Sequence, residues 1–361
     1  MKLLVVPSIG RKEDNANYFL AQEIINMYHL HGAEMAVCAP EDCGIHRATI
    51  YPSPMLKTGF FSLGSKSSPK YYTEYLWQRK FTNASYLKED TIAVRDAIIH
   101  FQPDLVFDLG RQSALIASKK QQVPVWSFVS GAMFRNKEVD SSYIKGINET
   151  LSEFRLEQIL HLNELYAIPE KLFAFGPLVT NPFPESFTIH RLGSMGNFIE
   201  DSDDGTKVSI FLGDVKERPS KIKTIIEETF LGAPYRVEAY YEGCKVGQNQ
   251  NIHYLDCFKE ENLKGCSVVI HDGNEFIYNR STILEKPQII VSDGSYLRSW
   301  VASSASRNGF AISVNEKELG VQSIYEAYRR ILVDDYYFDN AHEFSNQFKQ
   351  LGDLTKLLEF H

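Results

Sequence analysis

The chain has 361 residues, which at about 150 residues per domain suggests two domains. Hydrophobic residues make up 43% of it and aromatic residues 12%, enough for two sizeable cores. The net charge is −8 and no block of basic residues occurs, so neither nucleic acid nor an anionic membrane surface is an expected partner.

The N-terminus and the cysteines indicate a cytoplasmic protein. The apolar run in "MKLLVVPSIG" is too short for a signal peptide, and no later stretch is long and apolar enough to span a membrane. The cysteines are few and odd in number, which favours a reducing compartment. Cys38 and Cys43 have no second pair at metal-ligand spacing, so we predict no metal site.

The first half alternates short apolar runs with helical patterns. Residues 2–6 form a continuous apolar run, as expected of a strand buried on both faces of a parallel sheet. Residues 40–70 are rich in Pro, Gly and Ser and predict a loop, and Asp90 is expected to cap a helix that ends at His100. The other predicted elements are strands at 34–39, 104–108, 123–129 and 171–175, and helices at 18–30, 112–120 and 144–165.

A polar, acidic and glycine-rich stretch, "GSMGNFIEDSDDGT", separates the two halves. We therefore predict domains at 1–195 and 207–361, joined by a linker at 196–206. The second half restarts the alternation, with strands at 207–212, 235–241, 251–256, 267–270, 287–291 and 310–314 and helices between and after them. This pattern predicts an α/β protein with two doubly wound Rossmann-like domains that face each other across a cleft.

Charged residues follow the first predicted strand in "SIGRKEDNAN". Ligands bind at the carboxyl ends of parallel strands, so Glu13 and Asp14 are candidate catalytic residues. The alternative is a solvated turn in which Asp14 or Asn15 caps the next helix. The residues alone leave both interpretations open.

Asp108 ends the apolar strand of "PDLVFDLG". A carboxylate there would be partly desolvated, a setting in which it can act as a base or orient one. Capping of the helix that begins near Gly110 is an equal alternative.

The second half has two polar turns at predicted strand ends, Gly213-Asp214 and the start of "HDGNEFIYNRS". Glycine lets backbone amides approach a ligand, and a strand, polar turn and helix in this order often hold a diphosphate. His271 can donate to a phosphate or cap the helix. Asp214 and Asp272 would repel a diphosphate, and neither G-x-x-x-x-G-K-[ST] nor G-x-G-x-x-G occurs in the sequence.

Taken in order, these segments resemble the GT-B glycosyltransferases, specifically the UDP-glycosyltransferase-like family that includes the bacterial macrolide and antibiotic glycosyltransferases. The segments that carry the resemblance are "MKLLVVPSIG", "GAEMAVCAPEDCGI", "FQPDLVFDLGRQSALIASKKQQVPVWSFVSG", "KVSIFLGDV", "NQNIHYLDCFKEENLKGCSVVIHDG" and "PQIIVSDGSYLRSWVASSASRNGFAISV". It implies inverting, metal-independent transfer of a sugar from a UDP- or dTDP-sugar to a hydroxyl of a small-molecule or peptide acceptor. The first domain would bind the acceptor, the second the nucleotide-sugar, and the last helix, residues 353–360, would pack back on the first domain. Whether the chain also forms a homodimer or binds a protein partner is left open.

The resemblance also implies roles for individual residues. Asp108 falls on the acid that orients the family's catalytic His, but "GRKEDNAN" contains no His, and Glu13 or Asp14 occupies its place. Asp14 is therefore the expected base and Asp108 its partner. The expected contacts to the nucleotide-sugar are Gly10, Gly213, Asp214, Phe258, His271, Gly273, Asn274 and Asp293.

The predicted donor site departs from the family's pattern. Asp272 stands where the first Gly of the phosphate turn is expected, and Phe276-Ile277-Tyr278 replaces small residues. The ribose-binding acid falls near Asn279, and the sugar-binding Asp-Gln pair aligns with Tyr296-Leu297, with Asp293 close by. Two alternatives follow: a catalytically inactive member that acts as partner or activator subunit of another enzyme, or a nucleotide-sugar epimerase or hydrolase.

Overall fold

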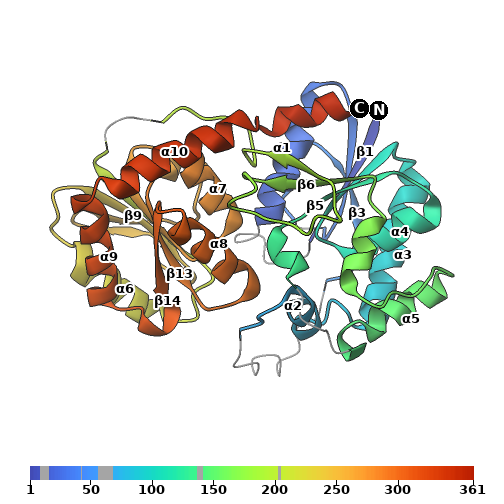
Figure 1. Cartoon of the computed structure of the whole chain (residues 1–361), viewed down its shortest axis with the longest axis horizontal. Coiled ribbons are helices and arrows are strands. Elements are labelled where there is room, and N and C mark those ends of the chain that lie inside the picture. Colours follow the sequence, from blue (N-terminus) through green and yellow to red (C-terminus); the bar gives the residue numbers. More distant parts are fainter. Residues whose placement is uncertain (9–15, 42, 56–67, 136–140, 202–204) are drawn as a thin grey trace. The chain divides into compact units, whose positions relative to one another are not determined.

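The computed structural model describes residues 1–8, 16–41, 43–55, 68–135, 141–201 and 205–361. The chain folds into two compact units (Figure 1). The first comprises Met1–Phe175 and Asn181–Arg191, and the second comprises Gly176–Thr180 and Leu192–His361. Each unit is described by itself below.

The described part of the first unit contains a seven-stranded sheet in the order β3-β2-β1-β4-β5-β6-β7. Strands β1 to β6 pair in parallel. The apolar runs of β1, β2, β4 and β5 are buried, as expected of strands covered on both faces, whereas the edge strand β3 is largely exposed. The strand order reverses between β1 and β4, which makes their carboxyl ends the switch point of this sheet. The strands are β1 (Lys2–Pro7), β2 (Glu34–Ala39), β3 (Thr49–Pro52), β4 (Leu105–Leu109), β5 (Val125–Phe128), β6 (Lys171–Phe175) and β7 (Ile189–Leu192).

Helices cover both faces of this sheet: in Figure 1, α1 lies on one side and α3 and α4 lie on the other. The helices are α1 (Ala16–Leu30), α2 (Tyr72–Gln78), α3 (Ala84–Phe101), α4 (Gln112–Gln121) and α5 (Lys145–Glu153). Two predicted boundaries were wrong. Helix α3 begins at Ala84, where Asn83 accepts a hydrogen bond from the amide of Tyr86, so that Asp90 lies inside the helix. Helix α5 ends well before residue 165, because Arg155 adopts a left-handed φ of 56°.

The described part of the second unit also contains a seven-stranded sheet, in the order β10-β11-β9-β8-β12-β13-β14. Its strands are parallel except for β10, which pairs antiparallel with β11 at the edge. The order reverses between β8 and β12, and their carboxyl ends form the switch point. The strands are β8 (Lys207–Leu212), β9 (Arg236–Tyr241), β10 (Gly247–Asn249), β11 (Ile252–Tyr254), β12 (Cys266–His271), β13 (Gln288–Ser292) and β14 (Ala311–Asn315).

The second sheet is likewise covered on both faces (Figure 1). Apolar residues of α6 and α9 pack on one face of β8, β9, β12 and β13, and α8 and α10 form a smaller core on the other face. The helices are α6 (Pro219–Phe230), α7 (Glu275–Ile283), α8 (Tyr296–Arg307), α9 (Val321–Val333) and α10 (Tyr336–Gln350), with 3-10 turns at Glu260–Leu263, Glu316–Glu318 and Leu354–Phe360. The predicted class, α/β with two doubly wound Rossmann-like sheets, is confirmed.

Candidate functional site

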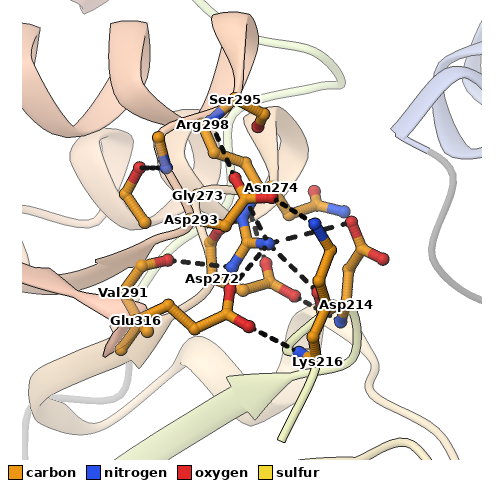
Figure 2. Close-up of polar contacts among 12 residues, drawn as sticks. Asp214, Lys216, Asp272, Gly273, Asn274, Val291, Asp293, Ser295, Arg298 and Glu316 are labelled. Carbon is orange, nitrogen blue, oxygen red and sulfur yellow. Dashed lines mark hydrogen bonds and ion pairs between the residues drawn. The ribbon is translucent and has the colours of Figure 1, made fainter. Parts of the chain in front are cut away.

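The carboxyl ends of β8, β12 and β13 meet at the switch point of the second sheet, and Arg298 lies at their centre (Figure 2). Its side chain is buried and comes from the first turn of α8. Nε donates to the carbonyl oxygen of Asp272, Nη1 to that of Asp214 at 3.0 Å, and Nη2 to that of Val291 at 3.0 Å. One guanidinium thus joins the ends of three parallel strands.

Carboxylates surround this guanidinium (Figure 2). Nη1 of Arg298 lies 3.4 Å from Glu316, 3.7 Å from Asp293 and 4.0 Å from Asp214. Burial opposes the positive charge of Arg298, but the carboxylates outweigh it and raise the pKa of the guanidinium. Lys216 adds a second cation: its Nζ lies 3.1 Å from Asp293, and its amide donates to Glu316 at 2.7 Å.

Asp272 is buried and uses both carboxylate oxygens on backbone amides. Oδ2 accepts from the amide of Asp214 at 2.7 Å, and Oδ1 accepts from the amide of Asn274 at 3.2 Å. Burial raises the pKa of Asp272 to about 7, although Arg298 and the two amides favour the charged form. This carboxyl group therefore titrates near neutral pH.

Asn274 caps α7, the helix that follows the predicted phosphate turn. Its side-chain oxygen accepts from the amides of Phe276 at 2.9 Å and Ile277 at 3.2 Å. Amides in the first turn of a helix have no partner within the helix and would otherwise be available to an anion. Here the side chain of Asn274 occupies the amides of Phe276 and Ile277.

His271 lies at the end of β12 and is fully buried. Nδ1 accepts from the amide of Gly273 at 3.2 Å, and Nε2 lies 2.9 Å from the side-chain oxygen of Gln288. Burial lowers the pKa of His271 to about 4, so the imidazole is neutral at pH 7 and Nε2–H donates to Gln288. Both ring nitrogens thus bind groups of the protein itself.

Gly273 is required by the backbone of this turn. Its φ is +87°, a region that other residues rarely adopt, and an added Cβ would lie 3.2 Å from Cα and Cβ of Arg298. The glycine therefore allows α8 to pack against the turn and brings the guanidinium to the strand ends.

Asn279 and Arg280, on α7, bind the segment that precedes β8. The side chain of Asn279 donates to the carbonyl oxygen of Gly193 at 2.7 Å and accepts from the amide of Met195 at 2.9 Å. Arg280 is fully buried, donates to Asn197 at 2.7 Å, and also bonds to the side chains of Ser194 and Glu260. Asn279, which lies near the position expected for a ribose-binding acid, thus holds the backbone of Gly193 and Met195.

Phe258 packs against the aromatic side chains of β8 and β9. Its ring is buried and meets that of Phe211 edge-on at 5.2 Å, and Phe211 stacks on Tyr240 at 5.5 Å. Phe211 and Tyr240 belong to the central strand β8 and its neighbour β9, and they point to the face opposite α6 and α9.

In the first unit, Asp108 ends β4 beside β1, where Val6 is its register partner. Its carboxyl group is fully buried: Oδ1 accepts from the amide of Arg111 at 2.7 Å, and Oδ2 accepts from Ser127 Oγ at 2.8 Å. Burial raises the pKa of Asp108 to about 7, which these hydrogen bonds only partly offset. The amide of Ser8 donates to Leu109 at 3.2 Å, so the loop after β1 starts beside this carboxyl group. Gly10, Glu13 and Asp14, the predicted residues of that loop, lie outside the described residues.

Arg111 joins α4 to α3 and β2 next to Asp108. Its guanidinium forms two hydrogen bonds with Asp90 and donates to the carbonyl oxygen of Cys38 at 2.7 Å. In the aromatic stretch at 71–81, Tyr72 is buried and accepts from Gln112 at 2.8 Å. The first turn of α4 is therefore fixed by side chains from several elements.

The structure brings four of the predicted donor-site residues, Asp214, Gly273, Asn274 and Asp293, together at one switch point (Figure 2). Gly213 precedes Asp214 in the same turn, and His271 accepts from the amide of Gly273. The sequence argument missed Arg298, Glu316 and Lys216. One signal was available for Arg298. It is the only basic residue between positions 287 and 306, and the two earlier strand-end turns each carry an acid, Asp214 and Asp272, for which the sequence shows no cationic partner. Helix α8 places it at the strand ends because it lies on the helix's buried face.

Among the described residues, no group of three or more His, Cys, Asp or Glu side chains is arranged to hold a metal ion. In the same part of the chain, no helix is long and apolar enough to cross a membrane.

No protein-family model matches the chain, and no curated protein matches its sequence. Solved structures do match it. The spinosyn rhamnosyltransferase SpnG in complex with thymidine diphosphate has a TM-score of 0.74 at 12% identity, covering 100% of this chain and 99% of its own. The calicheamicin glycosyltransferase CalG4 has a TM-score of 0.74 at 12% identity, covering 99% and 96%. The Streptomyces glycosyltransferase SsfS6, complexed with thymidine diphosphate, has a TM-score of 0.68 at 15% identity, covering 100% of both chains. The predicted resemblance is thus confirmed for the fold: the chain has the GT-B fold of the antibiotic glycosyltransferases.

Proposed function

We propose that the protein transfers a sugar from a nucleoside diphosphate sugar to a hydroxyl group of an acceptor. The observation that carries this proposal is the likeness of the whole chain to glycosyltransferases, two of which hold thymidine diphosphate. A UDP- or dTDP-sugar is the proposed donor, and the switch point of the second sheet is its proposed site, since ligands bind there in open α/β sheets. The acceptor would bind the first unit.

The proposed base is Asp14, in the loop that starts beside Asp108. Both oxygens of Asp108 accept hydrogen bonds from its own unit, so we propose that it positions the strand end and is not the base that takes the acceptor's proton. A carboxylate base next to a buried carboxyl group would have a raised pKa, which suits proton abstraction near neutral pH. The transfer would need no metal ion.

The test is a panel of UDP, dTDP, GDP and ADP and their glucose esters. A ligand that binds only the folded protein stabilises it by about 2.7 kcal/mol at 100 times its Kd, so the matching nucleotide should raise the Tm. Mass spectrometry of reactions with phenolic and macrolide acceptors would then detect a glycosylated product. Asp14→Asn should abolish that product and leave the Tm unchanged.

Two results would contradict the proposal. If no nucleotide changes the Tm and the protein copurifies with a second protein, the partner-subunit alternative replaces it. If the donor is consumed equally with and without acceptor, epimerisation or hydrolysis replaces it.

A further inference from the structure

Four backbone amides converge on the turns after β8 and β12, and side chains of the same turns hold all four. Asp272 takes the amides of Asp214 and Asn274, and Asn274 takes those of Phe276 and Ile277. Amides of this kind, at the switch point and at a helix start, are the donors that bind a diphosphate.

We propose that Asp272 and Asn274 are built-in substitutes for the diphosphate, and that a nucleoside diphosphate binds only when Asp272 loses its charge, because a protonated oxygen is a poor acceptor and gives up the amide that it holds. The inference rests on the proposed function, because it places the nucleotide at the same switch point. It makes Asp272 the residue that determines whether this site accepts an anion.

Charge supports this assignment. A carboxylate and a phosphate both only accept hydrogen bonds and both carry negative charge, so they compete for the same amides and repel each other. The charge of Arg298 offsets only part of the repulsion, and three of its five N–H donors already hold carbonyl oxygens. With Asp272 charged, the cluster has four carboxylates against two cations, which are Asp214, Asp272, Asp293 and Glu316 against Lys216 and Arg298.

Asp272 can lose its charge near neutral pH. Charged and titratable groups face it from every neighbouring element: Arg298 from α8, Asp214 and Lys216 after β8, Asp293 after β13, Glu316 after β14 and His271 on its own strand. Burial raises the pKa of Asp272 to about 7; Asp214 adds to this rise, and Arg298 and the two amides oppose it. Burial also raises the pKa of Glu316, but Glu316 holds the amide of Lys216, which is not one of the four. A fall in pH therefore favours the form of the site that admits an anion.

The experiment is titration calorimetry of the full chain with UDP and with dTDP, at about pH 6 and about pH 8. If only the protonated form binds, a pKa of about 7 gives about tenfold tighter binding at the lower pH. Asp272→Asn should bind at about pH 8 at least as tightly as the native chain does at about pH 6. The pH dependence of this variant also reports the ionisation of the ligand itself, whose terminal phosphate has a pKa near ~6.

Proton uptake gives a second measurement. At about pH 8, in buffers of different ionisation enthalpy, the native chain should take up close to one proton per nucleotide bound and Asp272→Asn close to none. Glu217→Gln is the matched control, because it removes one negative charge from the loop after β8 without affecting the four amides. If Asp272→Asn does not fold, Asp272→Gly and the native chain's proton uptake still test the proposal.

Equal affinity of the native chain and Asp272→Asn at about pH 8, without proton uptake, would overturn the inference and leave the proposed function standing. Binding by neither protein at either pH would overturn it as well. Tight binding by Asp272→Asn with no turnover of any donor would support the inference and contradict the proposed function.

Discussion

Replacing Asp108 by Asn should make the stability of the first unit less dependent on pH. Burial raises the pKa of Asp108 to about 7, whereas an unfolded Asp has a pKa near ~3.9. Between these values the folded chain keeps a proton that the unfolded chain has released, so the native free energy of unfolding falls as pH rises from about 4 to about 7. At ~1.36 kcal/mol per pKa unit, the loss between about pH 5 and about pH 8 comes to about 3 kcal/mol.

Asn preserves the geometry of the site. Its oxygen can accept from the amide of Arg111, and its NH2 group can donate to Ser127 Oγ, which is able to accept. The assay is urea unfolding followed by tryptophan fluorescence in a Trp300→Phe background, where Trp77 and Trp126 report on the first unit alone. Asp272 is present in both proteins, so its titration cancels. Parallel pH profiles for the two proteins would refute the reasoning.

Three further predictions concern the second unit and are checked by its unfolding free energy. Gly193→Ala should lower the unfolding free energy of the second unit by about 3–5 kcal/mol, because the added Cβ would lie 1.8 Å from the carbonyl oxygen of Phe348. Gly247 has open space around it, so Gly247→Ala should change this free energy by less than about 0.5 kcal/mol. Arg298→Met should lower the unfolding free energy by about 3–5 kcal/mol, because it leaves buried carboxylates and carbonyl oxygens without a donor. Arg298→Lys should not restore the lost stability, because a single ammonium group cannot reach the three carbonyl oxygens that the guanidinium holds. Full rescue by Lys would contradict this geometry. Asn279→Ala should cost about 1–3 kcal/mol and leave nucleotide affinity unchanged; a selective loss of affinity would instead assign Asn279 to the ligand.

The fold was predictable because its signals are local. Buried parallel strands appear as continuous apolar runs, and their alternation with helices at short spacing fixes the class and the order of elements. The ends of the same runs located Asp108 and the turn around Asp272 correctly at switch points. Helix boundaries were less secure, since Asn83 and Asp90 are both plausible caps and only the backbone shows which one accepts the amide.

The interior of the candidate site at the second switch point was not predictable, because its contacts join residues far apart in the chain. Arg298 meets the carbonyl oxygen of Asp214, 84 positions away, only after both strands and α8 have packed. Asn274 was expected to contact the nucleotide, and nothing local distinguishes an amide held by a ligand from one held by the residue's own side chain. Whether Asn274 contacts a ligand or caps its own helix depends on the tertiary surroundings of the turn, which the sequence alone does not determine.

The path of the chain limits how the two halves could be exchanged with those of another protein. Because Gly176–Thr180 and Leu192–His361 belong to one unit and Asn181–Arg191 to the other, the chain passes between the units at 175/176, 180/181 and 191/192. A fragment that starts at residue 207 would lack Thr180, whose carbonyl oxygen accepts from Ser304 at 2.7 Å, and the segment that Arg280 binds. It would leave a buried guanidinium with few partners. A transplantable second unit would have to carry these upstream residues with it, so a single cut at residue 207 is the wrong place to build a chimera.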